Sequence, residues 1–279
     1  MSDVLSSIRS GMDDLRSSEK KVAAYVLKNP ETVTTLSITD LAEEVGTSEP
    51  TVIRFCRKLG LKGFMDLKLS LARDLPSSQY IHESVHESDT LPRIFNKMLN
   101  AAREAFNETM NTMDLELLEK ASQALASAQR IEFYGVGGSG AVAQDAHHKF
   151  FRRGIPCLAY SDPHMQAMSA ALLGPGDVVV AISHTGSTKD IIDSAAIARE
   201  RGATVIGIVG RERSPMSRIC DITIPVHSPE AALRLAPMTS RLVQLAIIDV
   251  LFVSVALKDP GEVKSRLDAV KRTLVEKRY

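Results

Sequence analysis

The chain has 279 residues, which is enough for about two domains of ordinary size. Aromatic residues make up 5% of the sequence and Trp is absent, which argues against an aromatic platform that stacks on sugars or nucleic-acid bases. The formal net charge is zero, so the overall charge gives no sign of a nucleic-acid partner, and only the distribution of charge is informative.

The composition also indicates a compartment. Cys56, Cys157 and Cys220 lie far apart with no CxxC spacing, which is typical of core residues in a reducing cytoplasm. No apolar run reaches the roughly 18 residues of a membrane span, and the N-terminal segment lacks the unbroken apolar stretch of a signal peptide. We therefore expect a cytoplasmic protein without a membrane partner.

Residues 1–75 are predicted to be helical throughout. Apolar residues recur at helical spacing from Leu5 to Leu15. Ser17 or Ser18 is expected to cap a second helix that ends at Pro30.

The segment Ser37–Gly63 predicts a helix, a turn at Gly46 and a second helix capped by Ser48, and Ser37 with Asp40 forms a capping pattern for the first helix. On the second helix four apolar residues are predicted to face the core: Val52, Phe55, Cys56 and Leu59. Four others are predicted to face outward, as in a recognition helix: Thr51, Arg54, Arg57 and Lys58.

Basic residues are concentrated at and after this second helix. Between Thr51 and Arg73 only Asp66 is acidic, against six basic residues: Arg54, Arg57, Lys58, Lys62, Lys68 and Arg73. Arg54 is the candidate for base readout, with Arg57, Lys58 and Lys62 nearer the phosphates, and Ser48 and Thr51 complete the predicted DNA-binding set. A helical hairpin with solvated basic residues would show the same pattern, so this alternative stays open.

The segment 76–92 is rich in Ser, Pro, His and Glu without an apolar period and is predicted to be a linker. A helical stretch follows from Arg93 to Ala128. Five short β-branched runs come next: Arg130–Val136, Pro156–Ser161, Asp177–Ser183, Ala203–Gly210 and Asp221–Val226. Helices are predicted between and after them, at Ala141–Arg153, Lys189–Arg201, 237–257 and 262–278. This alternation predicts a three-layer α/β/α domain over 93–279 with a five-stranded parallel sheet.

Two loops that follow predicted strands suit an anion. In Gly135–Gly140 (GVGGSG) glycine amides such as those of Gly137 and Gly138 can approach a ligand at a helix N-terminus. The loop that starts at Ser183 (SHTGSTKD) places four hydroxyls within six residues. The first loop also fits a dinucleotide fingerprint, with Asp162 at the end of the next strand as the ribose-binding acid. The second loop favours a phosphorylated sugar.

The run SEPTVIRFCRKLGLKGFMDLKLSLA resembles the helix-turn-helix signature of the RpiR family of sugar-responsive regulators, and the two loops resemble those of its sugar isomerase (SIS) domain. The resemblance covers nearly the whole chain. It implies DNA contacts from Thr51, Arg54 and Arg57. It also implies phosphate contacts from Ser139, Ser183, Thr185 and Thr188, with Ser187 between them as a weaker candidate. Similarity to the HexR type within the family implies 2-keto-3-deoxy-6-phosphogluconate as the effector.

The predicted function is thus a transcription regulator, and a repressor relieved by a phosphosugar. It is expected to act as a homodimer or tetramer on a pseudo-palindromic DNA operator. No catalytic residue or cofactor is predicted. A metal site is not predicted either, since adjacent His147 and His148 diverge by about 100° on a helix. Two alternatives remain: a phosphosugar isomerase that uses Glu230 or Lys189, and a dinucleotide-sensing repressor.

Overall fold

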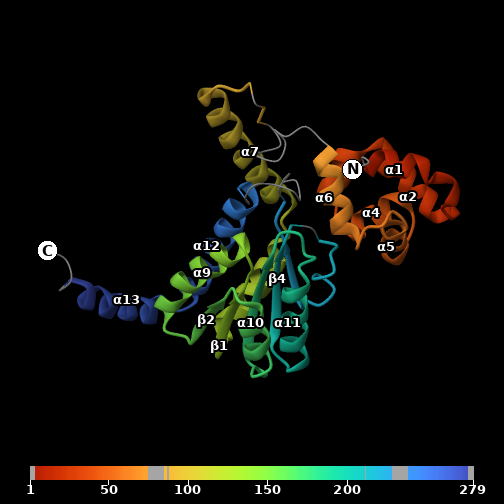
Figure 1. The fold of residues 1–279 in the computed structure, drawn as a ribbon. Coiled ribbons are helices and arrows are strands. Elements are labelled where there is room, and N and C mark those ends of the chain that lie inside the picture. Colours follow the sequence, from red (N-terminus) through yellow and green to blue (C-terminus); the bar gives the residue numbers. More distant parts are fainter. Residues whose placement is uncertain (1–3, 75–84, 87, 211, 228–237, 276–279) are drawn as a thin grey trace. The chain divides into compact units, whose positions relative to one another are not determined.

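The computed structural model describes residues 4–74, 85–86, 88–210, 212–227 and 238–275 (Figure 1). The chain divides into two compact units. One covers the residues up to Ala101, and the other begins at Ala102. The predicted linker lies partly outside the described residues, so the predicted domain boundaries stay predictions.

The N-terminal unit is built from short helices: α1 (Val4–Ser10), the 3₁₀ turn η1 (Met12–Asp14), α2 (Ser17–Lys28), α3 (Pro30–Thr35), α4 (Ile38–Val45), α5 (Glu49–Lys58) and α6 (Phe64–Asp74). Their apolar faces form one core, in which Val22, Leu41, Phe55 and Leu67 are fully buried. This unit has no strand in its described residues.

The helix-turn-helix prediction is confirmed at its boundaries. The side chain of Ser37 accepts from the amide of Asp40, and Asp40 accepts from the amide of Ser37 at 2.9 Å, so two of the free amides at the start of α4 are satisfied. Gly46 ends α4 at a φ of 65°, a conformation that costs glycine little. Ser48 is the N-cap residue of α5, as expected, but its side chain makes no capping hydrogen bond to a backbone amide, and its hydroxyl lies 3.0 Å from that of Thr51.

The expected cap of α2 differs. Its N-cap residue is Arg16, whose amide donates to the carboxylate of Glu19 at 2.9 Å, while Ser17 is already helical. The carboxylate of Glu19, and not the hydroxyl of Ser17 or Ser18, therefore satisfies a free amide at the start of α2. Pro30 follows the end of α2 and is also the first residue of α3. A proline is tolerated at this position because the amide of a first-turn residue has no acceptor within its own helix.

The helical stretch predicted over 93–128 is two helices, α7 (Leu91–Thr112) and α8 (Leu115–Ser127). The break occurs because Asp114 caps α8, accepting from the amide of Glu116 at 2.8 Å.

The second unit contains the predicted parallel sheet, with strands β1 (Arg130–Tyr134), β2 (Cys157–Tyr160), β3 (Asp177–Ser183), β4 (Thr204–Val209) and β5 (Ile222–Pro225). All neighbouring strands pair in parallel, in the order β2-β1-β3-β4-β5. The helices between and after them are α9 (Gly138–Phe150), α10 (Pro163–Ala170), α11 (Lys189–Glu200), α12 (Thr239–Lys258) and α13 (Pro260–Val275). A short 3₁₀ turn, η3 (Phe151–Arg153), follows α9.

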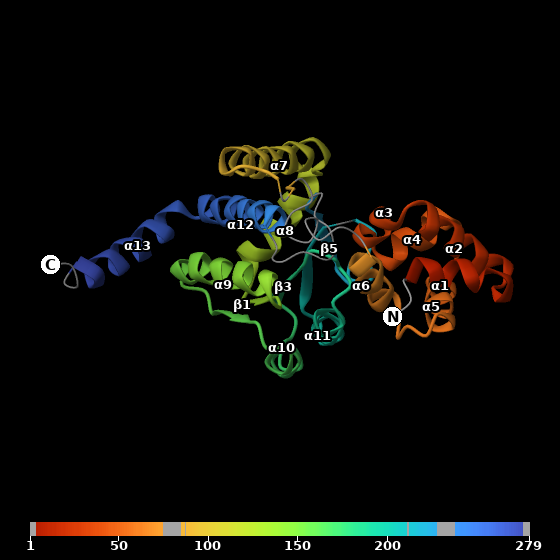
Figure 2. The same ribbon diagram turned by 45° about the horizontal axis from the view of Figure 1, so that its top comes forward.

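Helices cover both faces of this sheet (Figure 2). Helices α8, α9 and α12 pack on one face, in a core that includes Ile131 and Phe133. Helices α10 and α11 pack on the other face, in a core that includes Tyr134. All seven residues of β3 are buried, as expected for a central strand of a three-layer domain.

By length and composition, α12 is the one helix among the described residues that could cross a membrane. Its apolar residues Val243, Ile247, Leu251 and Val255 are buried in the core against the sheet. Only one side of the helix packs in the core, because Leu242, Val250, Val253 and Leu257 are 43%, 49%, 52% and 69% exposed.

Candidate functional sites

The exposed side of α5 is the candidate DNA-reading surface. Arg54 and Arg57 are exposed on it, and Lys62 is exposed just beyond its end, as the sequence predicts for residues that contact DNA. Val52, Phe55 and Cys56 face the core, as expected. Burial raises the pKa of the Cys56 thiol to about 12, so this cysteine stays protonated.

Thr51 was expected to face outward, and this expectation is wrong. It is 4% exposed, because it lies in the first turn of α5 on the side that faces the helical core. Its hydroxyl accepts from the guanidinium of Arg54 at 2.8 Å and shares a hydrogen bond of 3.0 Å with Ser48. Thr51 thus fixes the side chain of Arg54 instead of being presented to solvent.

The basic residues near α5 also differ in their surroundings. The ammonium of Lys58 donates to the carbonyl of Asp14 at 2.8 Å and pairs with Glu19 at 2.9 Å, so it connects α5 to α2. Lys68 is buried and donates to the carbonyl of Leu36 at 2.6 Å. The sequence could not separate these structural lysines from exposed ones, because their acceptors are distant in the chain.

The first candidate ligand loop follows β1. Gly137 has a φ of 58° and is the N-cap residue of α9, so the loop turns directly into a helix N-terminus. A side chain at Gly135 would collide with the backbone of Ser139, so this glycine is required for the tight turn. Gly137 is exposed, while Gly138 and Ser139 are partly exposed.

The second candidate loop follows β3. Ser183 is the last residue of the strand and is buried, and its hydroxyl lies 3.2 Å from that of Thr188, the N-cap residue of α11. Thr185 and Ser187 are exposed, and the Thr185 hydroxyl accepts from the amide of Ser187 at 3.2 Å. The four hydroxyls therefore lie on the residues that lead into the N-terminus of α11, where partial positive charge attracts anions.

The sheet order brings the two loops together. β1 and β3 are neighbours, and the chain leaves β1 toward β2 on one side and leaves β3 toward β4 on the other. Such a reversal point leaves a crevice outside the carboxyl ends of the strands, where ligands bind in open α/β sheets. Both predicted loops start at this point, one on each of the two strands.

Gln166, on α10, is a residue of this region that sequence reasoning missed. It is fully buried, and its amide nitrogen donates to the carbonyls of Tyr160 and Gly135 at 2.7 and 3.3 Å. These carbonyls lie at the carboxyl ends of β2 and β1, so Gln166 fixes the point where the first loop begins. Asp162 caps α10 by accepting from the amide of Met165 at 2.8 Å, which gives this acid a structural role.

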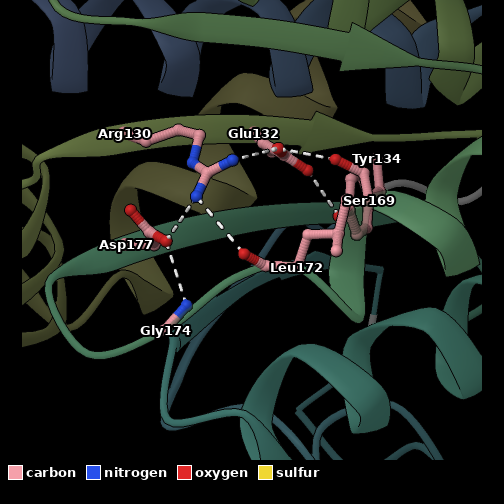
Figure 3. A network of polar contacts seen from close by, with 7 residues as sticks. All are labelled: Arg130, Glu132, Tyr134, Ser169, Leu172, Gly174 and Asp177. Carbon is pink, nitrogen blue, oxygen red and sulfur yellow. Dashed lines mark hydrogen bonds and ion pairs between the residues drawn. The ribbon is translucent and has the colours of Figure 1, made fainter.

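A buried polar network lies below the loops, on the face of β1 that contacts α10 (Figure 3). Glu132 is fully buried, and its carboxylate accepts from Tyr134 at 2.6 Å and from Ser169 of α10 at 2.8 Å. Arg130 pairs with Asp177 of β3 at 3.0 Å. Burial, and next the neighbouring Glu132, raises the pKa of the Tyr134 hydroxyl, so it remains a donor.

Of the two residues proposed for the isomerase alternative, only Lys189 is among the described residues. Glu230 lies outside the described residues. Lys189 is exposed and pairs with Asp193 on the next turn of α11. Among the described residues, no group of three His, Cys, Asp or Glu side chains could hold a metal ion.

Comparisons with known proteins agree with both halves of the chain. Residues 2–78 match the helix-turn-helix domain of the rpiR family, and residues 124–254 match the SIS domain. An HTH-type transcriptional regulator of Caldanaerobacter subterraneus is 42% identical over 98% of both chains. HexR of Pseudomonas aeruginosa, an HTH-type transcriptional regulator, is 37% identical over 100% of this chain and 98% of its own.

Among solved structures, the Vibrio vulnificus NanR protein complexed with ManNAc-6P superposes with a TM-score of 0.87 over 99% of both chains, at 30% identity. The fold and these matches define a helix-turn-helix protein with a SIS domain. The chain belongs to the rpiR family of transcriptional regulators, and the HexR proteins are among its full-length relatives.

Proposed function

We propose that this protein is a cytoplasmic repressor of sugar-catabolism genes, without enzymatic activity, that binds a pseudo-palindromic operator through α5 and releases it when a phosphosugar binds. The observation that carries the effector proposal is that the two loops predicted to bind an anion both start at the reversal point between β1 and β3, each at a helix N-terminus. The complex of the NanR relative with a sugar phosphate supports the same ligand class.

In this proposal Ser139, Ser183, Thr185 and Thr188 contact the phosphate, with Ser187 as a further candidate. Gly137 and Gly138 contribute backbone amides. Hydroxyls and amides can bind a phosphate dianion without an arginine, because a helix N-terminus adds partial positive charge. The effector we propose is 2-keto-3-deoxy-6-phosphogluconate, on the resemblance to the HexR type.

A thermal-shift series on the purified chain tests the effector. A ligand present at 100 times its Kd should stabilise the native protein by about 2.7 kcal/mol. We expect a shift with one sugar phosphate, none with the unphosphorylated sugar, and loss of the shift in Ser183→Ala. The exposed residue Ser127, at the end of α8, gives the control variant Ser127→Ala, which should keep the shift. A shift with NAD(H) alone would overturn the proposal in favour of a dinucleotide sensor.

Operator binding tests the DNA-reading surface. Arg54→Ala removes the guanidinium that can form two hydrogen bonds to a guanine edge, and it should cost about 1–3 kcal/mol in operator affinity. Arg57→Ala and Lys62→Ala should weaken binding to all sequences and lower its salt dependence. Electrophoretic mobility shifts on the operator and on scrambled DNA separate the two effects. Unchanged affinity and specificity in Arg54→Ala would contradict the assignment.

A further inference from the structure

The connection between β4 and β5 packs directly against the second candidate ligand loop, the one that follows β3. Met216 of this connection is fully buried, and its amide donates to the carbonyl of Gly186 in the loop at 2.9 Å. The amide of Gly210 donates to the carbonyl of His184, also in the loop, at 2.8 Å. We name residues 210–217, of which the structure describes all but 211, the strap.

These two hydrogen bonds set the polarity of the second loop. In a trans peptide the carbonyl of one residue and the amide of the next point in opposite directions, and the described residues contain no cis peptide bond. The carbonyls of His184 and Gly186 point at the strap, so the amides of Thr185 and Ser187 point away from it. Carbonyl oxygens repel an anion, whereas amide hydrogens attract it. The strap therefore removes two carbonyls from the side of the loop on which an anion could bind its amides.

Ser214 sets the distance between the strap and the loop. Gly186 has a φ of 59°, and a Cβ added to it would lie 2.3 Å from the Oγ of Ser214 and 2.5 Å from its Cβ. Rotation of the hydroxyl could relieve only the first of these collisions. The next heavy atom, Cγ1 of Val209, would be 3.8 Å away. The contact of the two segments at this point therefore depends on one glycine and one serine.

The conformation of the strap is fixed by contacts of its own. The amide of Ser214 donates to the hydroxyl of Ser217 at 2.8 Å, and that hydroxyl donates to the carbonyl of Ser214 at 2.8 Å. The amide of Ser217 donates to the hydroxyl of Ser214 at 3.2 Å. Met216 packs in the apolar core on the α10 and α11 side of the sheet. A segment fixed in this way can restrain a neighbouring loop.

We propose that the strap positions the second loop for phosphate: its amides bind the two carbonyls of the loop, and Ser214 fixes the place of Gly186, without contact to the ligand. This inference rests on the proposed function, because it assigns the second loop to a phosphosugar. Ser214 is then a positioning residue, and the strap and the loop should respond together when either is disturbed.

Two compensating substitutions test the contact by isothermal titration calorimetry. Gly186→Ala adds a methyl group that must displace the loop or the strap. It should raise the Kd for 2-keto-3-deoxy-6-phosphogluconate at least about 10-fold, the effect of losing one hydrogen bond to a charged group. Ser214→Gly removes both colliding atoms, and when added to Gly186→Ala it should restore at least about 3-fold of the affinity. A double variant that binds no more tightly than Gly186→Ala would overturn the proposal.

Gly202→Ala is the matched control. Gly202 has a φ of 92°, and an added Cβ would lie 3.1 Å from the side chain of Pro175, so alanine is strained there as well. It precedes β4, at the end of the sheet opposite the ligand loops. Gly202→Ala should keep the wild-type Kd within about 2-fold, because distant sites act independently. An equal loss of affinity in Gly202→Ala and Gly186→Ala would refute the positioning role.

Hydrogen–deuterium exchange of the ligand-free chain gives a readout that needs no effector. In Gly186→Ala the amides of Gly210 and Met216 should exchange at least about 10-fold faster, together with those of the loop, and they should slow again in the double variant. A peptide that covers β1 should keep its wild-type exchange rate, which shows that the domain is folded. Faster exchange in the loop alone would overturn the proposal. A wild type that binds no sugar phosphate but shows the coupled exchange would refute the effector and support the coupling of the strap to the loop.

Discussion

At the scale of single residues, Thr51 shows how a buried side chain can control an exposed one. Its hydroxyl lies between Ser48 and the guanidinium of Arg54, so the long arginine side chain is restrained before any DNA binds. Restraint of a flexible side chain in the free protein lowers the entropy that binding must remove.

The substitution Thr51→Val tests this positioning role, since it removes the hydroxyl while it keeps the shape and the burial. We expect the preference for operator over scrambled DNA to fall by about 3- to 10-fold, which corresponds to one hydrogen bond of about 1 kcal/mol. Fluorescence anisotropy with both DNAs measures it. If Thr51→Val retains the wild-type preference while Arg54→Ala loses it, Arg54 needs no positioning by Thr51.

The roles of these residues could be predicted from the sequence only in part. The burial of Val52, Phe55 and Cys56 could be predicted, because helical periodicity alone decides which side is apolar. The burial of Thr51 and the attachment of Lys58 to Glu19 could not, because each depends on a partner side chain whose position only the folded chain determines. Gln166 was missed for the same reason.

At the scale of elements, α10 contacts β1 through polar groups. Gln166 and Ser169 lie one turn apart and reach Gly135 and Glu132, while Met165 and Met168 of the same helix are largely exposed. Such a helix has the reverse of the usual amphipathic pattern, and this explains why the sequence did not predict it. The five strands, in contrast, were predicted to within two residues at each end, because continuous β-branched runs bounded by loops have one simple interpretation.

The network of Glu132 should be important for the stability of the second unit. Glu132→Ala leaves the buried hydroxyl of Tyr134 and the partly buried hydroxyl of Ser169 without their acceptor, at a cost of about 1–3 kcal/mol for a buried unsatisfied group. We expect the free energy of unfolding to fall by about 3 kcal/mol, measured by urea denaturation followed by circular dichroism. Glu119→Ala removes a carboxylate at the surface and serves as control, with a change of about 0.5 kcal/mol or less. Equal losses of unfolding free energy in the two variants would show that the buried network of Glu132 stabilises the protein no more than a carboxylate at the surface does.

At the scale of the whole molecule, acid should weaken the attachment of the recognition helix. The amide of Arg16, and next the ammonium of Lys58, hold the pKa of Glu19 below its ordinary value. A carboxyl whose pKa is lowered by folding stabilises the native state above its unfolded pKa of about 4.3, and this contribution is lost as the pH falls through the lower folded pKa.

Calorimetry of the full chain at several pH values tests this attachment. Glu19→Gln should lower the Tm of the N-terminal unit at pH 7. The difference from wild type should begin to shrink as the pH falls below the unfolded pKa of about 4.3, and it should vanish below the lowered pKa of the folded state, where Glu19 is protonated in both states. A difference that stays constant from pH 7 to pH 3 would mean that the charge of Glu19 is irrelevant.

The two edges of the sheet have a consequence for solubility. The outer strands β2 and β5 have four residues each, whereas the central β3 has seven. Proline stands directly before β2, as Pro156, and ends β5, as Pro225. Short edges bounded by a residue that cannot donate a backbone hydrogen bond are poor templates for strand addition. The sheet is thereby protected against edge-to-edge aggregation.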